Sequence, residues 1–173
     1  MRSFDGSNTA FDVVADLDLT GKKILITGAS GGLGAQAASV LAGRGAAIVI
    51  AARDETRSAQ LRSDILAIHP SANIFYVKLE LDDLTSVRSA AKAVLADHPV
   101  LDVVIANAGV MACDHKQTLD GFEYQLGVNH IGHFLFTCML VPALRAATSG
   151  RVVVLSSAGH KFGAIDLDDY NFD

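Results

Sequence analysis

The sequence contains no tryptophan, only two cysteines and only three prolines among its 173 residues. Cys113 and Cys138 stand in different segments and lack the Cys-x-x-Cys spacing of a thiolate metal site. We expect both to be buried, reduced thiols, as free cysteines usually are. No disulfide and no metal site is therefore predicted.

The chain also lacks an excess of one charge and a long apolar run. Its 14 basic and 19 acidic residues are interspersed and leave a formal net charge of −5, which disfavours nucleic acid as a partner. No apolar run reaches the roughly 18 residues of a membrane span. The first residues have neither the basic start nor the apolar centre of a signal peptide. We therefore expect a cytoplasmic protein without a membrane span.

Short β-branched stretches alternate with longer stretches of helical periodicity, in a chain that is 50% hydrophobic. Strands are predicted at KKILIT, AAIVIAA, ANIFYVKL, LDVVIANA and RVVVLS, and helices at residues 33–41, 56–68, 84–95 and 122–146. Such alternation pairs the strands in parallel through right-handed crossovers. The expected fold class is three-layer α/β, a doubly wound parallel sheet of the Rossmann kind. One domain of residues 16–173 is expected behind a leader of unclear structure at residues 1–15.

The first predicted strand runs into the glycine-rich turn TGASGGLG. Gly28, Gly32 and Gly34 suit a turn that needs a positive φ, close approach to a diphosphate and tight packing of helix on strand. The helix that follows points free N–H groups at an anion. An ordinary strand-to-helix turn remains the alternative, because three residues rather than one separate Gly28 from Gly32.

The spacing TGxxxGxG resembles the cofactor turn of the short-chain dehydrogenase/reductase family. Three further stretches resemble family motifs in the same order: LDVVIANAGV, GVNHIGHFLFT and RVVVLSSAGH. The resemblance covers roughly residues 16–173. The wording DGFExxxGVNHxGHF and SSAGH is most similar to the branch of retinol-dehydrogenase-like and WW-domain-oxidoreductase-like proteins.

The resemblance implies a dinucleotide site and a reaction. The cofactor site would comprise Thr27, Gly28, Ser30, Gly31, Gly32, Leu33, Gly34, Arg53, Glu80, Leu81, Asn107, Ala108 and Gly109. The reaction would move a hydride between the nicotinamide and a carbonyl or alcohol carbon. Ser157 would hydrogen-bond the substrate oxygen, and Asn129 would hold a water in the proton relay. The branch implies a small, lipophilic substrate and leaves a homo-oligomer open.

The end of the second strand, IVIAARDE, bears on the choice of dinucleotide. Ala52 stands where NAD-preferring relatives place an acid that binds the ribose 2′-OH, and Arg53 offers a guanidinium to a 2′-phosphate. Asp54 keeps NAD as the alternative unless it caps the next helix. NADP is therefore the expected cofactor. Glu80 stands where relatives place an aspartate that contacts the adenine amino group.

Family members take their proton from a tyrosine in a Tyr-x-x-x-Lys pair, because a nearby ammonium lowers the phenol pKa from about 10. Tyr170 is the only tyrosine after Ser157, and no lysine follows it. We therefore expect the C-terminal part of the domain to be missing and this chain alone to be inactive.

Four other functions draw on single features of the sequence. A non-catalytic NADP-binding or sensing module stays open, because the Tyr-x-x-x-Lys pair is not in the sequence. A metal site at His130 and His133 is disfavoured by the lack of suitably spaced cysteines. A serine hydrolase is disfavoured because LSSAGH lacks the leading glycine of a nucleophile elbow. A sugar-nucleotide epimerase usually carries GxxGxxG instead.

Overall fold

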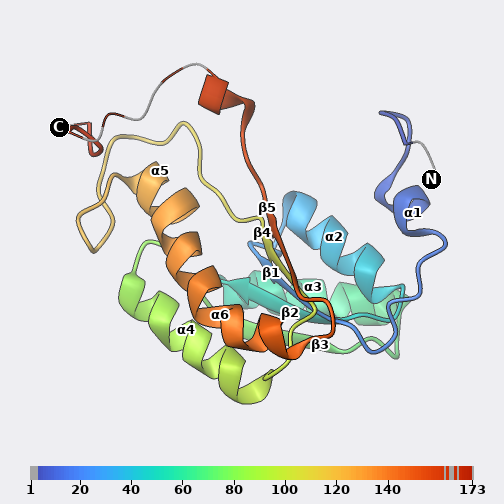
Figure 1. Ribbon diagram of the computed structural model, residues 1–173. Helices are drawn as coiled ribbons and strands as arrows, with labels where there is room; N and C mark the ends of the chain where they lie inside the picture. Colours follow the sequence, from blue (N-terminus) through green and yellow to red (C-terminus); the bar gives the residue numbers. More distant parts are fainter. Residues whose placement is uncertain (1–3, 162, 164–165, 167, 173) are drawn as a thin grey trace.

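Five parallel strands form one twisted sheet in the computed structural model, which describes residues 4–161, 163, 166 and 168–172 (Figure 1). The strand order is β3-β2-β1-β4-β5. The strands are β1 (Lys23–Thr27), β2 (Ala47–Ala52), β3 (Ile74–Lys78), β4 (Val103–Ala106) and β5 (Arg151–Val154). Each lies within a stretch that the sequence predicted.

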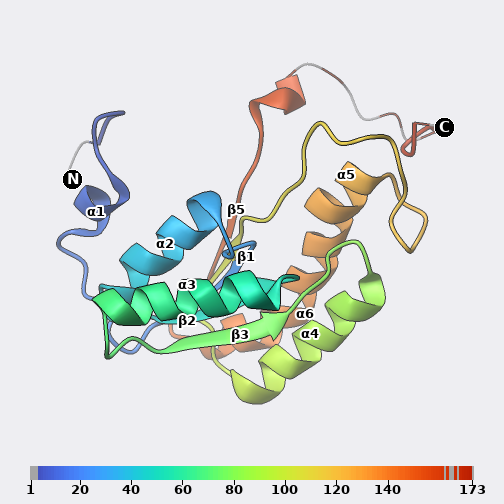
Figure 2. The same cartoon turned by 180° about the vertical axis from the view of Figure 1, so that it is seen from behind.

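Helices cover both faces of the sheet (Figures 1 and 2). One face carries α2 (Gly32–Ala42) and α3 (Glu55–Ile68), and the other carries α4 (Leu84–Asp97) and α6 (His133–Ala146). The doubly wound fold is therefore confirmed. Shorter elements are α1 (Ala10–Val14), α5 (Tyr124–Leu126), the π-helical turn η1 (Gly127–Gly132) and the 3₁₀ turn η2 (Ala158–Lys161).

The core has two halves, one on each face of the sheet. Leu25 packs toward α4 and α6 with the fully buried Phe136, whereas Ile24 and Ile26 pack toward α2 and α3. Successive side chains of the inner strands point to opposite faces of the sheet, and those on both faces are apolar. This double burial explains why the strand sequences are nearly uninterrupted apolar runs.

The segment Tyr124–Ala146 forms one continuous helical stretch of 23 residues through α5, η1 and α6. Its length and its mean hydropathy of 1.3 meet the requirements of a membrane-crossing helix. The expectation that no segment reaches that length was therefore wrong. Phe136 and Leu140 are fully buried on its inward face, where α6 packs against α4 and β4. The place of this helix in the core explains its apolar composition.

Two expectations outside the sheet need correction. The leader contains the short helix α1, in which Thr9 and Asp12 cap each other and Val14 is buried beside α2. Residues 1–3 of the leader lie outside the described residues, and the domain boundary at residue 16 stays a prediction. Cys138 is exposed on α6 and Cys113 is half-buried, so the prediction that both thiols are buried was wrong.

Candidate cofactor-binding site

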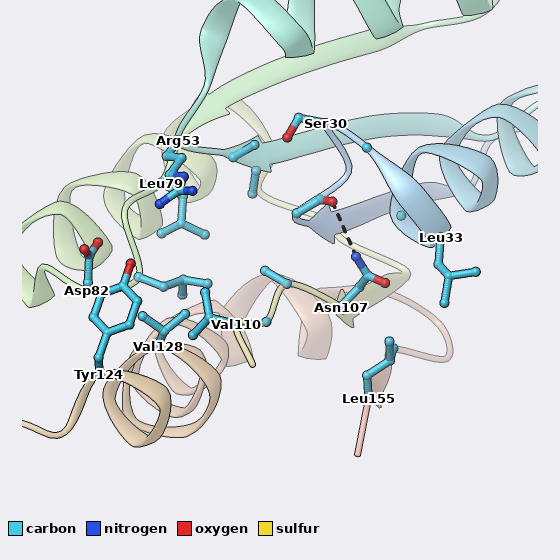
Figure 3. Close-up of a pocket in the computed structure, with 18 residues that line it drawn as sticks. Ser30, Leu33, Arg53, Leu79, Asp82, Asn107, Val110, Tyr124, Val128 and Leu155 are labelled. Carbon is cyan, nitrogen blue, oxygen red and sulfur yellow. Dashed lines mark hydrogen bonds between the residues drawn. The ribbon is translucent and has the colours of Figure 1, made fainter. Parts of the chain in front are cut away.

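A hollow of about 410 Å³ opens at the carboxyl ends of the strands (Figure 3). It lies where the strand order reverses between β1 and β4, which is where open parallel sheets bind their ligands. Residues after β1, β2, β3 and β4 all contribute to its wall. The predicted site residues on the wall are Gly28, Ser30, Gly31, Leu33, Gly34, Arg53, Leu81, Asn107, Ala108 and Gly109.

The turn after β1 packs directly on the loop after β4. Gly28 has a φ of +66°, and a Cβ there would lie 2.8 Å from the Cα of Ala108. A Cβ on Gly34 would lie 2.5 Å from the Nδ2 of Asn107 and 2.7 Å from the carbonyl oxygen of Gly28. Both positions exclude a side chain without rearrangement. The two glycines therefore let the walls of the hollow meet at backbone distance.

The amino end of α2 faces the hollow. Gly31 is its N-cap and offers no side-chain acceptor to the free N–H groups of the first turn. Ser30, Leu33 and Gly34 lie on the hollow wall beside it. Unpaired amides and the positive end of the helix dipole together favour a bound anion such as a diphosphate.

Asp54 caps the next helix at the end of β2, whereas the neighbouring Arg53 lies on the wall of the hollow. The Asp54 carboxylate accepts the Arg57 N–H at 2.9 Å and pairs with the Arg57 Nε at 3.4 Å, so Asp54 caps α3 as predicted. Arg53 lies exposed on the hollow wall, and no ion pair engages it among the residues that the structure describes. The guanidinium is therefore available to a ligand.

Glu80 does not line the hollow. Its Oε1 lies 3.1 Å from the Nζ of Lys78, with which the carboxylate forms an ion pair. Asp82, two residues further on, lies on the wall instead. Figure 3 shows Asp82 at the same end of the hollow as Arg53 and Tyr124. The adenine contact of Glu80 stays a prediction without direct geometric support.

Thr27 and Gly32 also lie off the wall. Thr27 is fully buried behind it, where the side-chain Nδ2 of Asn107 donates to the Thr27 carbonyl at 2.9 Å. Gly32 lies exposed at the start of α2. Thr27 therefore supports the site from behind, and the wall beside the helix comes from Gly31 and Gly34.

The two predicted catalytic residues lie outside the hollow. Asn129, within η1, accepts the Val110 N–H with Oδ1 and donates to the Val110 carbonyl with Nδ2, both at 2.8 Å. Ser157 is exposed beyond β5, and its Oγ accepts the Gly159 N–H at 3.1 Å. Ser157 thus caps the following turn. No hydrogen bond joins Asn129 to Ser157 in the described part of the chain.

Several wall residues escaped the sequence reasoning. Ala51, Ala52 and Leu79 follow directly from the rule that strand ends form the site, and Val110 follows the Asn-Ala-Gly motif. Leu155 follows β5 by the same rule, and Val128 belongs to the stretch GVNHIGHFLFT. No sequence signal marks the remaining wall residues Asp82 and Tyr124.

The family model described as short chain dehydrogenase matches residues 22–171. The chain belongs to the short-chain dehydrogenase family. This is a family of oxidoreductases, and the resemblance stated from the motifs is confirmed. The matched span begins just before β1 and includes every residue of the hollow wall.

Relatives of this short-chain dehydrogenase place it in the retinol-dehydrogenase-like branch. It is 42% identical over 158 residues to retinol dehydrogenase 12 of Bos taurus. That alignment covers 91% of this chain and 50% of the bovine protein. It is also 42% identical over 158 residues to retinol dehydrogenase 13 of Homo sapiens, covering 89% of this chain and 46% of the human protein. The chain therefore spans about half the length of the curated relatives it matches.

Solved structures show the same fold. An uncharacterised protein from Mycobacterium paratuberculosis superimposes with a TM-score of 0.80 at 40% identity, over 92% of this chain and 55% of that one. A short-chain dehydrogenase from Escherichia coli CFT073, complexed with NADPH, superimposes with a TM-score of 0.74 at 27% identity, over 90% of this chain and 67% of that one.

Proposed function

We propose that this chain forms the dinucleotide-binding part of an NADP-dependent oxidoreductase that moves a hydride between the nicotinamide and a carbonyl or alcohol carbon. The observation that carries the proposal is the wall of one hollow, which holds both the uncapped amino end of α2 and the unpaired Arg53. A diphosphate fits the first and a 2′-phosphate fits the second. The E. coli relative complexed with NADPH supports the same choice.

The turn after β1 fits a dinucleotide sterically. Gly28 and Gly34 leave no room for a Cβ of their own, so the turn stays thin enough for the cofactor backbone to approach it. Leu81, Val110 and Val128 add apolar wall surface for the flat rings. When bound, the nicotinamide gives or accepts the hydride.

Ser157 and Asn129 are the residues we propose for the substrate and the proton. The Ser157 oxygen accepts the Gly159 N–H, so its own hydrogen is free to donate to a substrate oxygen. Each end of the Asn129 amide makes one hydrogen bond to Val110, which leaves one lone pair and one hydrogen for a water. These groups would polarise the reacting oxygen and pass on a proton.

The proposed substrate is a small lipophilic alcohol or carbonyl compound, because relatives in this branch are named retinol dehydrogenases. The chain spans only about half the length of those proteins, and the residues that line its hollow suit the dinucleotide. A cytoplasmic location remains the prediction made from the sequence.

A non-catalytic NADP-binding or sensing module is the second candidate. The observation that favours it is the sequence itself, which contains no Tyr-x-x-x-Lys pair. Under this reading the hollow binds the dinucleotide and no hydride moves. Both candidates require dinucleotide binding, so binding is tested first.

The test is calorimetric titration of Arg53→Ala with NADPH and with NADH. Loss of a charge-assisted pair to the 2′-phosphate should weaken NADPH binding by about 1–3 kcal/mol, roughly 5-fold to 150-fold, and NADH binding far less. Arg57→Ala is the matched control, because Arg57 pairs with Asp54 and lies off the hollow wall. Equal weakening of both dinucleotides by Arg53→Ala would refute the assignment of the 2′-phosphate contact.

A further inference from the structure

A buried imidazole lies directly behind the dinucleotide site. His133, at the start of α6, is 5% exposed, and Thr27, at the end of β1, is fully buried. The Nε2 of His133 lies 2.8 Å from the Thr27 Oγ1. Its Nδ1 lies 3.0 Å from the carbonyl oxygen of Val128. The ring thus connects η1 to the strand that carries the glycine turn.

The Thr27 hydroxyl is also the acceptor for two backbone amides. The N–H groups of Asn107 and Ala108 both donate to its Oγ1, each at 2.9 Å. These residues follow β4 and have left the strand ladder there. One hydroxyl oxygen therefore replaces a strand partner for two successive residues of the hollow wall.

These contacts assign every proton. A hydroxyl oxygen has two lone pairs, and Asn107 and Ala108 use both, so the Thr27 hydrogen must donate to His133. The Val128 carbonyl can only accept, which requires the hydrogen of the neutral ring on Nδ1 and leaves Nε2 bare. The contact at Nε2 and the contact at Nδ1 therefore require the same neutral tautomer, with its hydrogen on Nδ1. Burial also lowers the pKa of His133, although the backbone of Val128 and Asn129 raises it.

We propose that His133 is a positioning residue of the dinucleotide site, whose bare Nε2 orients the Thr27 hydroxyl so that Thr27 holds the amides of Asn107 and Ala108. The inference rests on the proposed function insofar as it concerns cofactor affinity. Ala108 abuts Gly28, and the Asn107 amide abuts Gly34, so movement of this loop would displace both walls.

The test replaces His133 in the full chain with two residues. Each of them keeps a polar group near one of the two ring nitrogens and loses the other. His133→Gln places an acceptor oxygen near the position of Nε2 and retains the bond from Thr27. His133→Asn places a donor near Nδ1 and retains only the bond to Val128. Each variant loses one hydrogen bond of a buried group, so the number of lost hydrogen bonds alone predicts similar behaviour for both.

The first readout is hydrogen exchange of the Asn107 and Ala108 amides without cofactor. His133→Gln should keep their protection within about threefold of the wild type, whereas His133→Asn should speed their exchange about tenfold or more. The second readout is NADPH affinity, which should divide the variants in the same way. Equal protection in the Gln and Asn variants would overturn the inference.

A double-mutant cycle tests whether His133 acts through Thr27. Thr27→Val removes the hydroxyl, and His133→Leu should then add no more than about a twofold further loss of amide protection. Independent, additive losses would overturn the inference. If the wild type binds no NADPH, the proposed function fails, and the exchange data still decide the role of His133.

Discussion

Gly34 is a residue of the hollow wall where packing forbids a side chain. A Cβ there would lie within 2.7 Å of both the Asn107 amide nitrogen and the backbone oxygen of Gly28. Gly34→Ala should lower the free energy of unfolding by about 1–3 kcal/mol through overpacking, measured by denaturant titration.

Gly31→Ala is the matched control, because a Cβ on Gly31 would meet nothing within 4 Å and its φ of −177° is ordinary extended backbone. It should change stability by no more than about 0.5 kcal/mol. Equal losses in the two variants would remove steric packing as the reason for a glycine at position 34.

His133 gives the fold a predictable response to pH. Burial holds its pKa below the usual 6.5, so the folded chain keeps the ring neutral. Above pH 6.5 the ring is neutral in both the folded and the unfolded chain, so its protonation does not change the free energy of unfolding. As the pH falls below 6.5, the unfolded chain takes up a proton that the folded chain refuses, and the free energy of unfolding falls until the pH reaches the lowered value.

The measurement is denaturant unfolding at about pH 7.5 and about pH 5.5. Burial and the neighbouring Lys23 also lower the pKa of His98, which contributes in the same direction. His133→Gln and His98→Gln should therefore each reduce the loss of stability on acidification. A loss as large as that of the wild type in His133→Gln would contradict a neutral, buried ring.

The sequence predicted the dinucleotide-site residues whose position follows from the backbone. It was less successful for residues whose position depends on side-chain contacts. Gly28, Gly34 and Asn107 stand on the hollow wall because their motif fixes a turn and a strand end. Glu80 was predicted from the place of an aspartate in relatives, whereas its carboxylate pairs with Lys78 and the residue does not line the hollow. The pairing of His133 with Thr27 spans 106 residues of sequence, so no local pattern could reveal it.

At the scale of elements, η1 is tied to the loop after β4 by one side chain. Both hydrogen bonds of Asn129 go to the backbone of Val110. Asn129→Ala should lower the free energy of unfolding by about 1 kcal/mol, the usual net value of an exposed pair of such bonds. His130→Ala, on the exposed side of the same turn, should cost less. Equal effects of the two changes in denaturant titration would show that the tie to Val110 adds no stability.

Element order and type followed from the sequence because short β-branched runs alternate with longer stretches that suit helices. The predicted helix at 122–146 was nearly correct in extent, with Glu123 capping its observed start by accepting from the N–H groups of Gln125 and Leu126. The π-helical turn inside it was missed, because hydrophobic spacing does not distinguish one bulged turn from a regular one. The helix α1 was missed because five residues are too few for a period to emerge.

At the scale of the molecule, we propose that the 173 residues bind a dinucleotide, and their sequence contains no Tyr-x-x-x-Lys pair. We expect no measurable carbonyl reduction with NADPH from this polypeptide, assayed by loss of NADPH absorbance, because it contains no Tyr-x-x-x-Lys pair. A longer polypeptide that supplies such a pair after residue 173 should reduce carbonyls and lose that activity on Ser157→Ala. Turnover by the 173 residues, or a longer form indifferent to Ser157, would overturn the catalytic assignment.

Amide chemical shifts during an NADPH titration show whether the hollow between β1 and β4 binds NADP. Shifts should concentrate in the turn after β1, at Arg53, and in the loop that begins at Asn107, where the wall residues lie. A second hollow, lined by Cys113, His115 and Phe172, lies elsewhere and should stay unchanged. No shifts at all, or shifts confined to that second hollow, would contradict the account.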